Sequence, residues 1–249
     1  MTDPNDDWSE VRIGEHHCEL YEPGRCNEHG FAVIYLHSAV VDCRAEVQPF
    51  LERLRAHGLP VVAPVTQRSW WGDKICPEFD ATTTPETYLL DRVVPYLGSR
   101  WSTGPGQVGL LGIGMGGQGA LRLAYKHPTT FPVVAALAPT IDYQSQYEED
   151  VNLQRMYPDP EAVRQDTATL HVHPLNWPRH QFFCCDPAEY MWWESADRLR
   201  MKLSSLGVPH ECDLDTTAQA DTRAYCEAMA ERTVRFLAQG LDQERLRLV

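Results

Sequence analysis

A glycine-rich turn carries the first residues whose spacing suggests chemistry. The apolar run 108–111 leads into a dense group of glycines and then into an apolar helical segment. In the pattern Gly-x-Ser-x-Gly, which follows a strand and opens a helix, the central serine is a nucleophile for acyl transfer. Here the pattern runs from Gly112 to Gly116 and has Gly114 at its centre. Both flanking glycines are therefore present, and the hydroxyl is missing.

Acyl transfer also needs a base that takes the proton from the nucleophile, most often a histidine that an acid orients. Asp186 follows an apolar run, and of the ten histidines only His210 lies after it in the chain. His210 opens an expected strand, whereas catalytic groups of parallel sheets gather at the carboxyl ends of strands. We therefore expect no histidine to serve as the base.

The elements that position these residues alternate between short apolar runs and helical periodicities, which is typical of a mostly parallel sheet. The strands are expected at 31–36, 59–64, 108–111, 131–137, 181–185 and 210–214. The helices are expected at 46–56, 84–101, 117–126, 194–206 and 221–238, followed by a charged tail at 242–247.

The polar, aromatic and proline-rich segment 141–180 interrupts this alternation, and we interpret it as an inserted cap. No linker is long enough to separate two domains. The prediction is one domain over 1–249, with helices on both faces of a mostly parallel sheet.

Over about residues 30 to 238, the chain resembles the esterase D-like branch of the α/β-hydrolase superfamily. The features that carry the resemblance are the loop Tyr-Leu-His-Ser at 35–38, the turn and helix at 112–121, Asp186, and the final helix ending in Arg-Phe-Leu at 235–237. The resemblance implies an α/β-hydrolase fold. It also implies that Gly114, Asp186 and Asp221 occupy the nucleophile, acid and histidine positions of a catalytic triad.

Asp221 is a poor replacement for the histidine, because a carboxyl with a reference pKa near ~3.9 is a far weaker base than imidazole. Two roles remain open for it. Asp186 and Asp221 would lie close together in the family geometry, and such a pair either shares a proton or binds a cation. Alternatively, Asp221 caps the helix that follows it, which is a common role of Asp.

The resemblance also implies a pocket at the glycine-rich turn. The backbone N–H of Met115 and that of Ser38 or Ala39 would point at the oxyanion position. Trp70 and Trp71 follow a strand, so they either form a wall of this pocket or cover the edge of the sheet.

Other candidate groups are weaker. His171, His173 and His180 with the pair at 184–185 show no recognised zinc spacing, so we predict no metal site and no cofactor. The two thiols lie in an expected buried strand, where cysteine is inert, and the same objection applies to Ser38 and Cys43 as replacement nucleophiles.

Composition limits the class of protein. A net charge of −13 argues against nucleic acid and anionic membranes as partners. No apolar run approaches the ~18 residues of a membrane span, and the acidic first eight residues do not look like a signal peptide. Eight cysteines without an export signal indicate reduced thiols and a cytoplasmic protein.

Together these features predict a non-catalytic member of the esterase D-like branch that binds a small molecule in the former active-site crevice or acts as a scaffold. One alternative is an active ester hydrolase with a non-standard nucleophile. Another is a protein–protein interaction module that uses the acidic surface and the cap.

Overall fold

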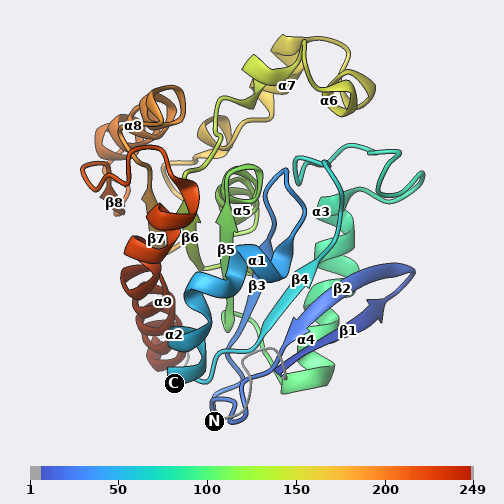
Figure 1. Cartoon of the computed structure of the whole chain (residues 1–249), viewed down its shortest axis with the longest axis vertical. Helices are drawn as coiled ribbons and strands as arrows, with labels where there is room; N and C mark the ends of the chain where they lie inside the picture. Colours follow the sequence, from blue (N-terminus) through green and yellow to red (C-terminus); the bar gives the residue numbers. More distant parts are fainter. Residues whose placement is uncertain (1–6, 248–249) are drawn as a thin grey trace.

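The computed structural model describes residues 7–247, and an eight-stranded sheet forms its centre (Figure 1). The strands are β1 (Trp8–Ile13), β2 (His16–Tyr21), β3 (Ala32–Leu36), β4 (Val61–Pro64), β5 (Val108–Ile113), β6 (Val133–Leu137), β7 (His180–Cys184) and β8 (Glu211–Asp213). Their spatial order is β1-β2-β4-β3-β5-β6-β7-β8. All pairs from β4 to β8 are parallel, and β2 is antiparallel to both β1 and β4.

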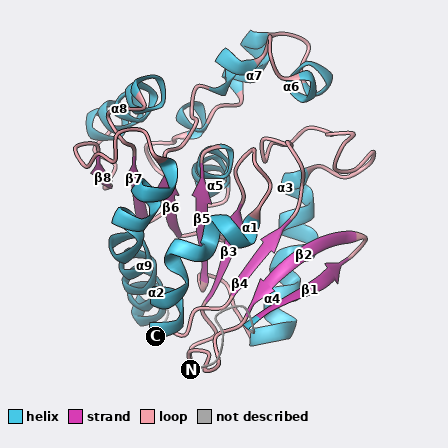
Figure 2. Ribbon diagram, viewed as in Figure 1, coloured by secondary structure: helices cyan, strands magenta, loops and turns pink. Residues whose placement is uncertain are grey.

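Helices cover both faces of the sheet, as Figure 2 shows. They are α1 (Cys43–Val47), α2 (Leu51–Ala56), α3 (Pro85–Tyr88), α4 (Val94–Trp101), α5 (Met115–Lys126), α6 (Val151–Met156), α7 (Pro160–Gln165), α8 (Tyr190–Ser205) and α9 (Thr222–Arg247). Helices α1, α2 and α9 contribute to one apolar core, and α3, α4, α5 and α8 contribute to the other. The mostly parallel, doubly covered sheet predicted from the sequence is confirmed.

The side chains of β3 show how the two cores arise. Ala32, Ile34 and Leu36 point into one core, whereas Val33 and Tyr35 point into the other. Successive strand residues face opposite sides of a sheet, and every residue of β3 is apolar and buried. An apolar run without alternation is what a central parallel strand requires, because both of its faces are covered.

Three expectations need correction. The hairpin of β1 and β2 was not predicted, because its alternating polar residues give a weak signal at the edge of the sheet. The helix expected at 46–56 is divided by the 3₁₀ turn Gln48–Phe50. The charged segment 242–247 is no tail but the last part of α9, where Leu241 and Glu244 are buried.

The segment between β6 and β7 contains only short helices, α6, α7 and the 3₁₀ turns Tyr143–Gln146 and Ala168–His171. It extends beyond the carboxyl ends of the strands (Figure 1). In the part of the chain that the structure describes, no helix is both long and apolar enough to cross a bilayer.

Candidate functional site

Gly114 lies between the end of β5 and the start of α5, with backbone angles φ 56° and ψ −116°. A Cβ atom built on Gly116 would lie 1.8 Å from the carbonyl oxygen of Leu36, and one on Gly112 would lie 2.2 Å from the carbonyl oxygen of Gly116. A Cβ on Gly114 would meet only the Cβ of Ser38, at an ordinary 3.6 Å. The flanking glycines are thus required by packing, whereas position 114 has room for a side chain.

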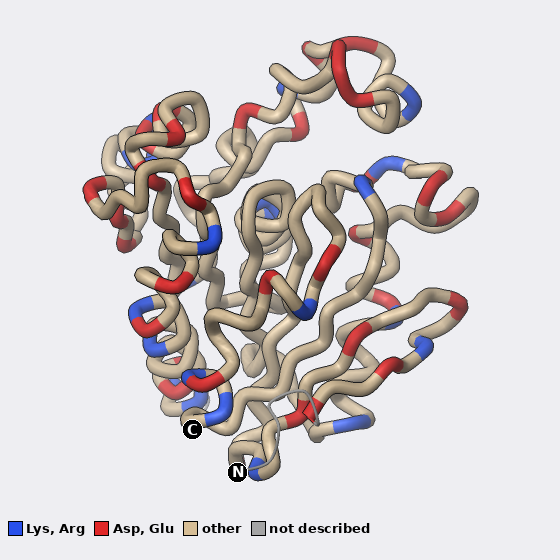
Figure 3. Tube along the Cα trace, viewed as in Figure 1, with Lys and Arg blue, Asp and Glu red and all other residues tan. Residues whose placement is uncertain are grey.

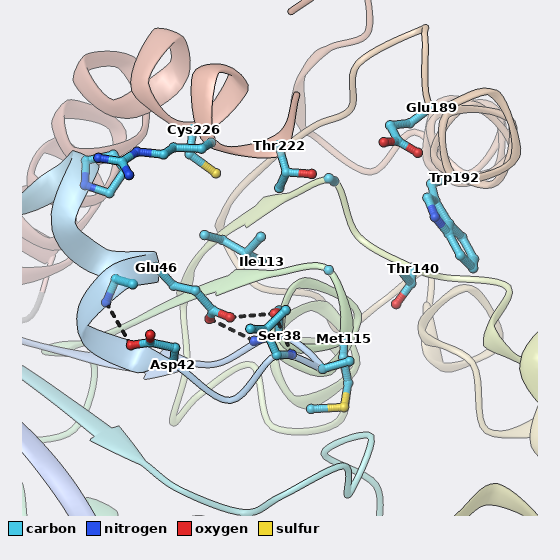
Figure 4. Close-up of a pocket in the computed structure, with 17 residues that line it drawn as sticks. Ser38, Asp42, Glu46, Ile113, Met115, Thr140, Glu189, Trp192, Thr222 and Cys226 are labelled. Atoms are coloured by element: carbon cyan, nitrogen blue, oxygen red, sulfur yellow. Dashed lines mark hydrogen bonds between the residues drawn. The ribbon is translucent and has the colours of Figure 1, made fainter. Parts of the chain in front are cut away.

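A cavity of about 590 Å³ opens beside this turn, at the carboxyl edge of the sheet (Figure 4). Of the predicted pocket residues, Ser38, Ala39, Gly114 and Met115 line it. The cavity has the size of a small-molecule site. Within residues 7–247 no histidine contributes to its lining.

A hydrogen-bonded carboxylate next to the turn was not foreseen from the sequence. Glu46 Oε2 accepts hydrogen bonds from the Ser38 N–H at 2.9 Å and from the Tyr35 hydroxyl at 2.6 Å. The Ser38 hydroxyl donates to Glu46 Oε1 at 2.5 Å, and Figure 4 shows both bonds to Ser38. The N–H of Ser38 is therefore engaged and is no oxyanion donor. Among the described residues the N–H groups of Ala39 and Met115 have no protein acceptor, so they are available to a ligand.

Asp186, the expected acid, is buried beyond the end of β7. Its carboxylate accepts hydrogen bonds from the Thr217 hydroxyl at 2.7 Å and from the N–H groups of Ala188, Ala218 and Ala220 at 2.8, 2.7 and 3.1 Å. Burial alone would raise the pKa of Asp186, but these hydrogen bonds outweigh it and lower the pKa. The carboxylate holds the loop before α9 in place.

Asp221, the residue expected at the histidine position, is exposed. Its Oδ1 accepts a hydrogen bond from the Ala224 N–H at 3.0 Å, and its carbonyl oxygen accepts one from the Tyr225 N–H at 2.9 Å. These are the bonds of a helix N-cap, the second of the two roles considered for Asp221. The neighbouring Thr222 lines the cavity, and Asp221 does not.

Trp70 and Trp71 do not line this cavity. Both are buried, Trp70 stacked on Tyr143 with ring centroids 4.9 Å apart. The indole N–H of Trp71 donates to the carbonyl oxygen of His37 at 3.1 Å. A Cβ atom on Gly119 would lie 2.4 Å from Trp71 Cβ, so this glycine makes room for the indole. The ligand-wall interpretation was wrong, and the two rings belong to the core.

His37 precedes the cavity-lining loop and is fully buried. Its Nε2 accepts a hydrogen bond from the Thr66 N–H at 3.1 Å, so the ring proton is on Nδ1, which donates to the carbonyl oxygen of Ser38 at 2.7 Å. Burial lowers the pKa of His37 to about 4. The ring is neutral at pH 7, and both its nitrogens are used to hold the backbone.

Several cavity residues carried no recognisable sequence signal. They are Thr140, Glu189, Trp192 and Cys226, which come from three separate parts of the chain. Cys226 is no obvious nucleophile, because burial raises its pKa to about 12. Cys184 and Cys185 are buried in or next to β7, as expected. Within residues 7–247 no group of three or more His, Cys, Asp or Glu side chains is arranged to hold a metal ion.

Left-handed backbone conformations gather at the same edge of the sheet. Among the described residues, seven non-glycine positions with positive φ follow the carboxyl ends of strands: Val41, Gln67, Trp70, Trp71, Ala138, Gln219 and Ala220. Such conformations cost energy and persist only where the surrounding structure enforces them. A β-branched residue such as Val41, with φ 62°, is an outlier among them. Strain of this kind clusters at functional sites.

Comparison with known proteins identifies the family. The model of a family described as "Putative esterase" matches residues 13–237. The chain belongs to this esterase family. A search of curated proteins finds no match.

Several solved structures resemble this esterase-family chain and share its α/β-hydrolase fold. FphF, a fluorophosphonate-binding serine hydrolase of Staphylococcus aureus, is 15% identical with a TM-score of 0.71, and the match covers 93% of this chain and 97% of that one. MPT51 (FbpC1) of Mycobacterium tuberculosis is 16% identical with a TM-score of 0.68, over 92% and 98% of the two chains. The S-formylglutathione hydrolase FrmB of Staphylococcus aureus is 15% identical with a TM-score of 0.67, over 93% and 98%.

Proposed function

We propose that this member of the esterase family binds a small organic ligand in its cavity and does not hydrolyse it. The observation that carries the proposal is Gly114, which has room for a side chain and offers no nucleophile. The cavity beside it remains open, and the N–H groups of Ala39 and Met115 are available there. Such groups at a helix N-terminus bind a carbonyl oxygen or an anion without any chemistry.

The other two triad positions support the same proposal. The carboxylate of Asp186 already accepts four hydrogen bonds from its neighbours, and Asp221 caps α9. Acyl transfer without a nucleophile and a base loses several powers of ten in rate.

An active hydrolase is the second candidate, and one contact favours it. The Ser38 hydroxyl donates to the Glu46 carboxylate, as in a nucleophile–base pair, and Ser38 lies beside the place of the missing side chain. Against this candidate, Ser38 Oγ also accepts a hydrogen bond from the Val40 N–H at 3.1 Å. No histidine lines the cavity in residues 7–247 to protonate a leaving group.

Ester hydrolysis distinguishes the two candidates. We expect the wild-type protein neither to turn over short-chain 4-nitrophenyl esters above the buffer rate nor to react with a fluorophosphonate probe. Two double variants supply a nucleophile and a base. One combines Gly114→Ser with Asp221→His. The other combines Gly114→Ser with Thr222→His, because Thr222 lines the cavity. Activity in either double variant, with none in the wild-type protein, would support a decayed triad. Wild-type turnover that Ser38→Ala abolishes would refute the proposal and identify Ser38 as the nucleophile.

Binding is tested separately, by thermal shift and calorimetry with small phenylalkyl compounds. Ala45 lines the cavity, so Ala45→Trp should fill part of it and weaken binding. Binding that is unaffected by this substitution would place the ligand elsewhere.

A further inference from the structure

The charged groups around the cavity have one predominant sign. Asp42, Glu46 and Glu189 line it, and within residues 7–247 none of the three forms an ion pair. The only basic lining residue of the described chain, Arg223, is exposed and pairs with Glu227 at 3.2 Å. The charged side chains of the cavity wall are therefore predominantly acidic.

Glu46 accepts the most hydrogen bonds of these carboxylates. Hydrogen bonds from the Tyr35 hydroxyl and from both the N–H and the hydroxyl of Ser38 hold its two oxygens in one place. All three donors are neutral, so they orient the carboxylate without cancelling its charge. A fixed charge beside a partly enclosed space favours an opposite charge there, because water screens it less than on an open surface.

Two uncharged residues of the wall add a polar and an aromatic group to it. The Oγ1 atom of Thr140 is buried, and no hydrogen-bond partner is found for it among the described residues. A buried polar atom without a partner is uncommon and needs an explanation. Trp192 offers an aromatic surface near Glu189 (Figure 4), against which an apolar group can pack. The remaining wall is largely apolar, with Ile113 and Met115 at its base.

We infer that the cavity selects an organic cation, an ammonium group on an apolar body, with the ammonium beside Glu46 and the apolar part against Ile113, Met115 and Trp192. This inference rests on the ligand-binding function proposed above. It replaces the cation site expected at Asp186 and Asp221, whose oxygens are used by the backbone of the loop and helix.

The test compares three probes of similar size and different charge by calorimetry at pH 7: 4-phenylbutylamine, 4-phenylbutanol and 4-phenylbutyrate. We expect the amine to bind about tenfold more tightly than the alcohol, because charge-assisted hydrogen bonds are the stronger ones, and the carboxylate to bind least. Glu46→Gln, which keeps the size of the side chain, should remove most of the preference for the amine. Glu189→Gln should reduce it independently, and it disturbs no hydrogen bond to Ser38.

Glu52→Gln is the matched control, because it removes the same charge from α2 at a side chain that is 88% exposed. It should leave all three affinities unchanged. Equal or tighter binding of the alcohol or the carboxylate to the wild type would overturn the cation inference and leave the ligand-binding function standing. An amine preference that survives both Glu46→Gln and Glu189→Gln would overturn the inference as well. If none of the three probes bound, both the inference and the binding function would be contradicted.

Discussion

Gly112, Gly114 and Gly116 occupy one turn, yet different physical constraints act on each. Gly112 and Gly116 lack space for any side chain, because main-chain atoms would lie within 2.2 Å of a Cβ atom. Gly114 has space, but its φ of 56° disfavours any residue other than glycine. A serine here would be strained, and the present glycine relieves that strain.

The first prediction contrasts two of these glycines. Gly114→Ala should lower the free energy of unfolding by about 1–3 kcal/mol, the cost of holding an L-residue in a sparsely populated backbone conformation. Gly116→Ala should cost more than about 4 kcal/mol or prevent folding, because its Cβ would collide with the Leu36 carbonyl and the central sheet would have to shift. Urea unfolding of both variants measures the difference. Equal losses of unfolding free energy would contradict the different constraints inferred for Gly114 and Gly116.

At the scale of elements, α5 carries a buried arginine that connects it to two other segments of the chain. Its buried Arg122 forms ion pairs with Glu86 on α3 at 2.5 Å and with Asp166 at 2.6 Å, the latter in the segment between β6 and β7. Burial opposes the charge of Glu86, but His127, Arg122 and Lys126 together lower its pKa to about 2. One side chain thus joins the central helix to two peripheral segments.

The second prediction concerns this junction. Arg122→Ala should destabilise the protein by about 3–5 kcal/mol, because it leaves two carboxylates without their buried partner. It should also make the segment 141–180 more susceptible to proteolysis. Arg164→Ala removes an exposed arginine that pairs with Glu161 in the same segment and serves as the control, with little change expected in either measurement. Similar behaviour of the two variants would show that Arg122 does not anchor the segment.

At the scale of the whole molecule, acidic residues are scattered over many segments of the chain (Figure 3). The groups that make stability depend on pH are buried instead. His37 is held neutral in the core, with its pKa lowered to about 4. Glu86 is held ionised, with its pKa lowered to about 2.

The third prediction follows from these two groups. Between pH 6.5 and 4 the unfolded chain binds a proton at His37 that the folded protein does not, so stability falls as the pH is lowered through this range. The full effect of one such group is about 3 kcal/mol, since each pKa unit corresponds to about 1.4 kcal/mol. The contribution of Glu86 is present above about pH 4.5 and is lost only as the pH falls from there towards 2.

Urea unfolding at a series of pH values separates the two contributions. His37→Gln, whose amide can still accept from Thr66 and donate to Ser38, should flatten the profile from pH 6.5 to 4.5 and leave the decline at lower pH unchanged. A wild-type stability that does not change between pH 6.5 and 4.5, or a variant with an unaltered slope, would argue against a buried neutral His37.

The class of fold and the absence of a serine at position 114 can be read from the amino-acid sequence alone. Both follow from local information: apolar runs of strand length, helical periodicity, and the identity of a residue at the centre of a recognisable turn. The helix periodicity before Arg235 also placed Asp221 at the start of α9, which the structure confirms.

The hydrogen-bond partners of the polar groups around the cavity become apparent only in the folded chain. Asp186 meets the loop at 217–220 and Trp71 meets Gly119 across long stretches of chain, and Glu46 of α1 turns back to Ser38 in the loop after β3. The partner of each group depends on how loops from different strands converge, and on the side to which each side chain turns. Apolar patterning predicts which segments are buried, because burial follows from the average character of many residues. A hydrogen bond depends on the positions of single atoms, and the sequence pattern does not specify these.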